Sequence, residues 1–171
     1  MEANSGLWET MSKYVLEIFP SVYKDFIDID LLPHLSRIAG AFMGCVINMG
    51  REGIPVVMKP HRDVKERRFG VMCLCPFGNY EDGGVILWEL KVVVELGPGD
   101  LLFFPDSLIH HSNEPVKGER NSVVSSINDA VSQSLSLEPM TCRAIDREGF
   151  RVVDISELKS PLNTTRICQR S

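Results

Sequence analysis

Eight short apolar runs separated by turn signals lie between residues 41 and 127, and they constrain the fold more than any other feature. Short strands at this spacing are typical of an all-β sandwich or barrel, and a jelly roll fits them. The expected strands are Ala41–Met49, Pro55–Lys59, Phe69–Cys75, Val85–Leu90, Val92–Leu96, Leu101–Phe104, Leu108–His111 and Ser122–Ile127. The expected turns are Met49-Gly50, Gly78-Asn79, Asp82-Gly83-Gly84, Gly97-Pro98-Gly99-Asp100 and Lys117-Gly118.

A helix is expected before these strands, because apolar residues recur there at helical spacing. Ser5 can cap its start and Pro20 ends it. Its single apolar stripe predicts a helix that lies against a sheet. The stripe consists of Leu7, Met11, Tyr14 and Ile18, with Trp8, Val15 and Phe19 beside them. A second helix is expected from Leu31 to Ile38, and an edge strand from Phe150 to Asp154. The predicted fold class is therefore mainly β with N-terminal helices (α+β).

A chain of 171 residues is most simply one domain. We expect a helical N-terminal support over residues 1–39, a β core over 40–130 and a C-terminal extension over 131–171. The net charge of −5 argues against attraction of the whole surface to nucleic acid or to an anionic membrane. No signal peptide and no apolar run of about 18 residues is evident, so we expect a cytoplasmic or nuclear protein without a membrane span.

Five widely spread cysteines, an odd number, suit a reducing compartment better than a disulfide framework. Cys73 and Cys75 would share one face of a strand, because side chains at i and i+2 point the same way. A single Cys-x-Cys is too little for a zinc site, so the pair is interpreted as packed core.

The string Lys59-Pro60-His61-Arg62-Asp63 places an imidazole and a carboxylate two residues apart. In a strand His61 and Asp63 would project together, as two members of a facial triad that binds Fe(II) and leaves three positions open. His111 is a candidate third ligand, and Arg120 offers a guanidinium fork suited to gripping a carboxylate. A lone His-x-Asp is common by chance, so the hypothesis depends on the order of the features that follow it.

That order runs from His-x-Asp through two glycine-rich turns and the Pro105–His111 segment to Gly-x-Arg-x-Ser at residues 118–122. It resembles the 2-oxoglutarate/Fe(II) dioxygenase superfamily, whose core is a double-stranded β-helix of the jelly-roll or cupin-like kind. Within that superfamily, the run HRDVKERRFGVMCLCPFGNYEDGGVILWELKVVVELGPGDLLFFPDSLIHHSNEPVKGER is similar to a group of fungal dioxygenase-like proteins. This group is itself similar to the TET/JBP-type nucleobase oxygenases. The resemblance covers roughly residues 40 to 130.

The resemblance implies an oxidoreductase that uses Fe(II), 2-oxoglutarate and O2. His61, Asp63 and His111 would be the catalytic metal ligands. Arg120 would pair with the distal carboxylate of 2-oxoglutarate, and Ser122, two residues on, would add a hydrogen bond. The cosubstrate would be converted to succinate and carbon dioxide while a substrate is hydroxylated.

The choice between His110 and His111 is open in the residues themselves, because only one of two neighbours in a strand can face the interior. Gly99, Pro105 and His110 match much of the second cupin motif, which would make His110 the ligand. Ser107 and Glu114 depart from that motif. The fungal dioxygenase-like pattern places its histidine just before Ser112-Asn113, which favours His111.

The substrate is not readable from the sequence, and a nucleobase or a small metabolite is considered. Arg62, Lys65, Arg67 and Arg68 form a basic cluster beside the expected site, either as a solvated turn or as a landing site for an anionic substrate. A chain this short lacks room for a large DNA-recognition insert, so nucleic acid is not the favoured partner. A cupin-like or degenerate β-helix that binds metal or ligand without catalysis is the alternative function, and Arg120 argues against it.

Overall fold

The computed structural model describes residues 5–29, 37, 40–50, 57–127 and the backbone of 151–154. Two helices, α1 (Ser5–Ile18) and α2 (Pro20–Ile27), precede the strands. Neither described helix is long and apolar enough to cross a membrane. The strands are β1 (Gly44–Asn48), β2 (Met72–Asp82), β3 (Val85–Leu87), β4 (Val92–Glu95), β5 (Leu102–Phe104), β6 (His111–Asn113), β7 (Val116–Ser126) and β8 (Arg151–Asp154).

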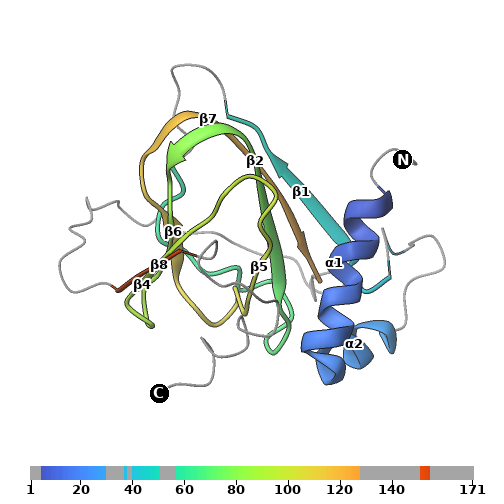
Figure 1. Ribbon diagram of the computed structural model, residues 1–171. Coiled ribbons are helices and arrows are strands. Elements are labelled where there is room, and N and C mark those ends of the chain that lie inside the picture. The colour runs from blue at the N-terminus through green and yellow to red at the C-terminus, as the bar shows by residue number, and fades with distance from the viewer. Residues whose placement is uncertain (1–4, 30–36, 38–39, 51–56, 128–150, 155–171) are drawn as a thin grey trace.

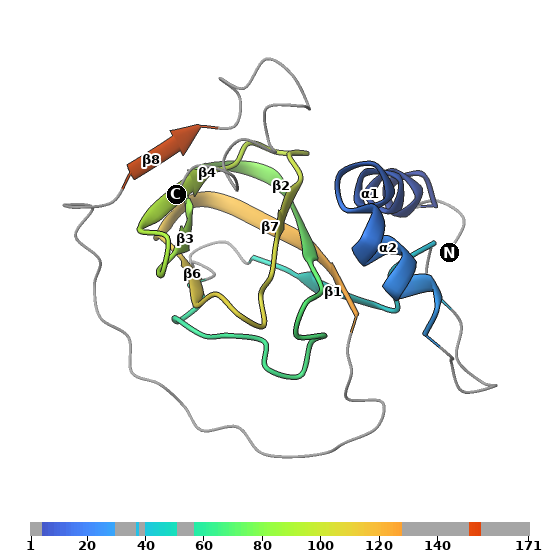
Figure 2. The ribbon, with the colours of Figure 1, turned by 90° about the horizontal axis from the view of Figure 1, so that it is seen from below.

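The described strands form two four-stranded sheets that face each other (Figures 1 and 2). One has the order β1-β7-β2-β5 and the other the order β6-β3-β4-β8. All pairings are antiparallel except that of β4 with β8. The inner faces enclose an apolar core. Its buried members are Met72, Leu74, Val85, Leu87, Val92, Val94, Leu96, Leu102 and Phe104. This is the mainly β, jelly-roll architecture that the sequence predicts, and β8 is the expected edge strand.

The helices cover the outer face of the first sheet (Figure 1). Met11 and Val15 of α1 and Phe26 of α2 are buried there against strand residues such as Cys73 and Val123. This agrees with the expected apolar stripe. Pro20 ends α1 as predicted. It also begins α2, a helix that the sequence analysis did not predict. Proline is favoured in the first turn of a helix, so the same residue can end one helix and begin the next. The expected helix Leu31–Ile38 lies outside the described residues except for residue 37.

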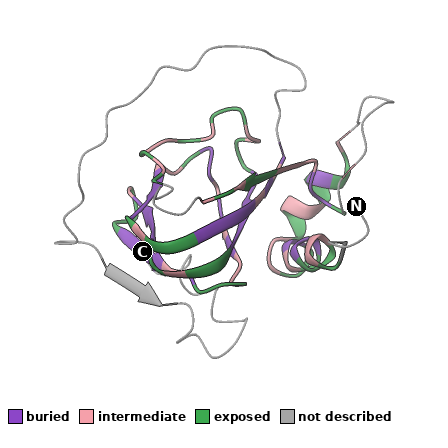
Figure 3. Ribbon diagram, turned by 90° about the horizontal axis from the view of Figure 1, so that it is seen from above, coloured by how far each residue is buried: buried purple, intermediate pink, exposed green. Residues whose placement is uncertain are grey.

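The longest pairing joins β2 to β7, from Cys73 opposite Ser125 to Asp82 opposite Val116. The paired strands are buried at one end and exposed at the other (Figure 3). Their exposed ends form an arch at the top of Figure 1. The turns expected at Gly78-Asn79 and Lys117-Gly118 are wrong, because both segments lie inside these strands. Gly78 and Gly118 have φ of +119° and +90°, so the glycines let the strands bend without ending them.

Several strand boundaries also differ from the predicted ones. The predicted strand Phe69–Cys75 begins only at Met72, since Gly70 N donates to Arg67 O in a turn. The predicted strand Leu108–His111 is replaced by β6, because the amides of Leu108 and Ile109 turn back to Pro105 O. Likewise, the run expected to continue to Leu90 ends at Leu87. The expected strand Pro55–Lys59 is partly outside the described residues, and its residues 57–59 are not in a strand.

Candidate metal centre

The segment that carries His61 and Asp63 lies alongside β6, which begins at His111. His61 N donates to His111 O at 3.1 Å, and His111 N donates to His61 O at 2.9 Å, forming an isolated antiparallel bridge. Asp63 N donates to the carbonyl oxygen of Asp106 at 3.2 Å. His61 and Asp63 do not lie in a regular strand, because the pairing of residues 57–63 is confined to the bridge at His61. Backbone hydrogen bonds nevertheless hold both residues beside His111.

Three donor groups converge at this bridge. Nε2 of His61 lies 3.7 Å from Oδ1 of Asp63, and Nε2 of His111 lies 3.6 Å from Oδ2 of the same carboxylate. The three candidate ligand atoms all lie within 4.8 Å of one another. These distances are too long for strong hydrogen bonds, and they leave room for a cation between the groups. Within the described residues this is the one cluster of three or more such side chains.

The remaining nitrogen of each imidazole faces a backbone carbonyl. Nδ1 of His61 lies 2.7 Å from Lys59 O, and Nδ1 of His111 lies 3.1 Å from Ile109 O. A carbonyl can only accept a hydrogen bond, so the neutral tautomer that fits each contact has its proton on Nδ1 and its lone pair on Nε2. Metal-binding histidines are commonly oriented in this way.

His111 is buried, whereas His61 and Asp63 are partly exposed. Burial lowers the pKa of His111, which favours the neutral imidazole that can bind a metal. Its ring packs edge-on against Phe104, with the centroids 5.0 Å apart. The site therefore has one side inside the barrel and one side open to solvent.

His110 points away from this cluster. Its Nδ1 lies 2.6 Å from Oε1 of Glu89, and its backbone N donates to Oε2 of Glu89 at 2.8 Å. Burial acts to raise the pKa of Glu89, but hydrogen bonds with the His110 side chain and with the backbone of Glu89 and His110 outweigh it. The pKa of Glu89 is therefore lowered. Of the two neighbouring histidines, the structure brings only His111 together with His61 and Asp63.

A pocket with about 590 Å³ of empty space, including the part open to solvent, lies between the sheets. Asp63, His111, Arg120 and Ser122 all line it. Its apolar wall is made by Met72, Leu74, Val85, Phe104 and Val124. Two of the three predicted metal ligands, Asp63 and His111, thus meet the predicted carboxylate-binding residues at one cavity, although they come from separate segments.

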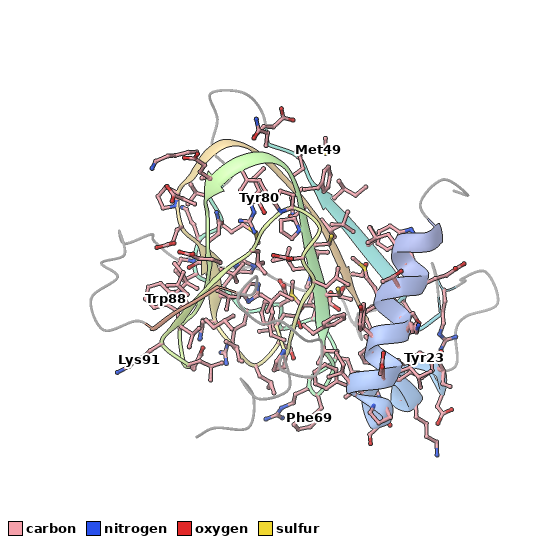
Figure 4. All side chains as sticks on the ribbon, viewed as in Figure 1. Tyr23, Met49, Phe69, Tyr80, Trp88 and Lys91 are labelled. Atoms are coloured by element: carbon pink, nitrogen blue, oxygen red, sulfur yellow. The ribbon has the colours of Figure 1, made fainter. Side chains whose placement is uncertain are left out.

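Arg120 is buried, and its side chain is held from two sides. Its Nη1 donates to Gly83 O at 2.8 Å, and its guanidinium carbon lies 5.5 Å from the ring centroid of Tyr80. Figure 4 shows Tyr80 beneath the arch of β2 and β7, where its hydroxyl donates to Leu96 O at 2.7 Å. Within the described part of the chain, Nε of Arg120 is buried and has no hydrogen-bond partner. A buried cation with an unused donor is suited to an anionic ligand.

Two asparagines on the pocket wall were not predicted as site residues. Asn48 of β1 lies opposite Ser122 of β7, and its Nδ2 donates to Ser122 Oγ at 3.2 Å. Asn113 lies two residues after His111, and its Oδ1 accepts a hydrogen bond from Met58 N at 2.6 Å. The i, i+2 relation to His111 could have indicated Asn113, but only the strand register places Asn48 in the pocket.

The basic cluster is adjacent to the metal-ligand candidates. Arg62, Lys65 and Arg68 are exposed, whereas Arg67 is half-buried and donates its backbone N–H to Ile127 O. Arg68 places its guanidinium carbon 5.7 Å from the ring centroid of Phe69, which is 75% exposed. In Figure 4, Phe69 lies at the lower edge of the molecule.

No family model matches the chain, and no curated protein matches its sequence. Solved structures do match, among them NgTET1 in complex with 5mC DNA, with a TM-score of 0.58 and 19% sequence identity. The match covers 72% of this chain and 47% of that chain, so the chain spans about half the length of this neighbour. At this identity the likeness shows the fold alone. The chain therefore has a double-stranded β-helix fold of the jelly-roll kind, as this neighbour does.

Proposed function

We propose that this chain is an Fe(II)- and 2-oxoglutarate-dependent dioxygenase. His61, Asp63 and His111 would hold the iron, and Arg120 with Ser122 would bind 2-oxoglutarate. The observation that carries the proposal is the buried guanidinium of Arg120, whose Nε has no hydrogen-bond partner among the described residues, in the pocket that Asp63 and His111 line. A simple metal-binding β-helix has no need of this buried cation.

The donor set suits the proposed ion. Two imidazoles with free Nε2 atoms and one carboxylate match the two-histidine, one-carboxylate set that binds Fe(II) and leaves positions for other ligands. The backbone carbonyls behind His61 and His111 would keep both imidazoles in the ligating tautomer. The chain's own hydrogen bonds would thus prepare the site.

The surroundings of Arg120 support its proposed role. The bond to Gly83 O and the cation–π contact with Tyr80 hold the guanidinium in one orientation. A carboxylate of 2-oxoglutarate would supply the acceptor that Nε lacks, and a charge-assisted pair in a partly dry pocket is strong. Ser122 is on the same strand and lines the same pocket, so its hydroxyl could add a hydrogen bond.

When bound, the iron and 2-oxoglutarate supply the oxidation of a substrate C–H bond by O2. The protein would orient the cosubstrate through Arg120 and hold the metal ligands through backbone bonds. The apolar pocket wall would keep bulk water from the reacting groups.

The proposed substrate is either a nucleobase or a small metabolite. The exposed Arg62, Lys65 and Arg68 form a cationic surface beside Asp63, and Phe69 adds an exposed ring. Cations with an interleaved aromatic ring are suited to a nucleic-acid strand. The neighbour NgTET1 is seen with 5mC DNA. Substrate panels should therefore contain methylated single-stranded and double-stranded DNA as well as small metabolites.

Succinate release tests the proposal. The full chain with Fe(II), ascorbate and 2-oxoglutarate should form succinate, and Asp63→Ala should abolish it. Metal binding without 2-oxoglutarate binding or turnover, with and without the substrate panel, would contradict the proposal. That result would favour the non-catalytic, cupin-like alternative.

A further inference from the structure

We infer that Asn113 is a positioning residue for this site. Its carboxamide holds the segment bearing His61 and Asp63 against β6 before any metal is bound. The inference rests on the proposed function in one respect, namely that His61, Asp63 and His111 are metal ligands.

The carboxamide of Asn113 connects two segments that are distant in sequence. Its Oδ1 accepts a hydrogen bond from Met58 N at 2.6 Å, and its Nδ2 donates to Glu114 O at 2.8 Å. The side chain is 8% exposed, so these bonds are largely protected from water. The bond to Glu114 O fixes the orientation of the carboxamide, and the bond to Met58 fixes the incoming chain.

The hydrogen bond at Met58 N affects the metal-ligand candidate His61 through the next residue, Lys59. Lys59 follows Met58, and its carbonyl oxygen lies 2.7 Å from Nδ1 of His61. The bridge between His61 and His111 holds the segment at one point, and Asn113 holds it three residues earlier. With two fixed points the Lys59 carbonyl cannot swing away, so Nε2 of His61 stays directed toward Asp63.

Partners that orient metal ligands typically contribute about 10- to 100-fold to metal affinity. Removing the Asn113 carboxamide should therefore weaken metal binding even though all three ligands remain. The same change should increase hydrogen exchange at Met58 N–H in the metal-free protein. A residue that contributes only to general stability would not produce this combination.

Asn121 provides a matched control. It is 5% exposed, and its Oδ1 accepts a hydrogen bond from Gly50 N at 2.8 Å, so it also joins two distant segments. Asn113→Ala and Asn121→Ala remove the same groups from buried positions. In the part of the chain that the structure describes, the side chain of Asn121 bonds to Gly50 and Glu119 and not to a segment that bears a metal-ligand candidate. Comparing them separates an effect on the site from a loss of stability.

The experiment titrates Mn(II) into the full chain by calorimetry without 2-oxoglutarate and measures Tm in EDTA. We expect Asn113→Ala to lose about 10-fold or more in Mn(II) affinity, and Asn121→Ala to lose Tm with little change in affinity. Asn113→Asp, which keeps an acceptor for Met58 N–H, should retain more of the hydrogen-exchange protection than Asn113→Ala and provides a folded variant if the alanine fails.

Equal Mn(II) affinity in wild type and Asn113→Ala would overturn the inference and leave the proposed function standing. Equal losses of affinity in the two alanine variants would overturn it too. If the wild type binds no divalent metal, the proposed function fails. Amide exchange at Met58 and His61 then still tests whether Asn113 holds the segment.

Discussion

His61 and His111 exchange both hydrogen bonds of an antiparallel bridge, at 3.1 and 2.9 Å, and their ring centroids lie 4.3 Å apart. The main chain thus brings together two imidazoles that are far apart in sequence. Neither Nε2 atom is used in the bridge, and both lie within 4 Å of an oxygen of Asp63. The placement of these groups depends on backbone pairing and leads to predictions about each of them.

The first prediction concerns metal binding. His61→Ala and Asp63→Ala should each lower the affinity for Fe(II), or for Mn(II) as a substitute, by more than about 100-fold. Losing a metal ligand should cost more affinity than losing the group that orients it, which typically costs about 10- to 100-fold. Anaerobic calorimetry measures the change. Asp82→Asn removes an exposed carboxylate paired with Lys117 and should bind metal like the wild type. Full metal binding in both ligand variants would place the site elsewhere.

The second prediction distinguishes the neighbouring histidines. His111→Ala should abolish metal binding, because His111 is the buried member of the cluster. His110→Ala should retain the metal, because its ring is partly exposed and paired with Glu89. Metal analysis after gel filtration measures both variants. The reverse pattern would support the cupin register and count against the dioxygenase proposal.

The third prediction concerns Arg120. Arg120→Ala should keep its metal but lose 2-oxoglutarate affinity, at a cost of ~2 to 5 kcal/mol or roughly 30- to several-thousand-fold. Arg120→Lys should be intermediate, since it keeps the charge without the fork. The metal-to-ligand absorption band follows the titration.

Lys117→Ala is the control for Arg120, because it removes an exposed cation from the same strand. It should bind 2-oxoglutarate like the wild type. Unchanged affinity in Arg120→Ala would show that the buried guanidinium does not bind the cosubstrate, and the non-catalytic alternative would then be favoured.

The fourth prediction concerns stability and pH in the metal-free protein. Burial, with contributions from Asp63 and Glu66, raises the pKa of Asp106 to about 7 from the usual 3.8. Below pH ~4 the carboxyl of Asp106 is protonated in both the folded and the unfolded state, so its titration does not yet lower the free energy of unfolding. As pH rises toward about 7 only the unfolded state releases the proton, and stability falls by up to about 4 kcal/mol.

Asp106→Asn should remove this pH dependence. In the wild type, Ser107 N–H donates a hydrogen bond to Oδ1 of Asp106 at 2.9 Å. The amide of the variant stays neutral and its oxygen can still accept this bond. Urea unfolding in EDTA between about pH 4.5 and 8 should show the variant gaining stability relative to the wild type as pH rises. Parallel curves for the two proteins would mean that Asp106 titrates normally.

The succession of short apolar runs was sufficient to predict a mainly β fold with N-terminal helices. Alternation along a strand is a local property, so Cys73 and Cys75 were correctly expected to share a buried face. The order of His61, Asp63, His111 and Arg120 likewise identified four residues that the fold brings to one region. Their roles as ligands remain predictions.

Predictions of turns and helix ends from single glycine or proline residues were wrong or incomplete where these residues lie within a strand or at the start of a helix. Gly78 and Gly118 bend β2 and β7 without ending them, because each is opposite a residue of the partner strand that maintains the pairing. Pro20 both ends α1 and begins α2. In each case the residue type permits two outcomes, and only contacts with the rest of the chain select one.

The amino-acid sequence defines which side chains are available and carries the periodicity that favours strands over helices. The folded chain is needed to show that His110 pairs with Glu89 while His111 faces the pocket, and that Asn48 and Asn113 line the same pocket. These placements depend on strand register and on hydrogen bonds between distant segments. Register is set by the packing of whole sheet faces, because a shift of one residue would exchange the buried side chains for the exposed ones.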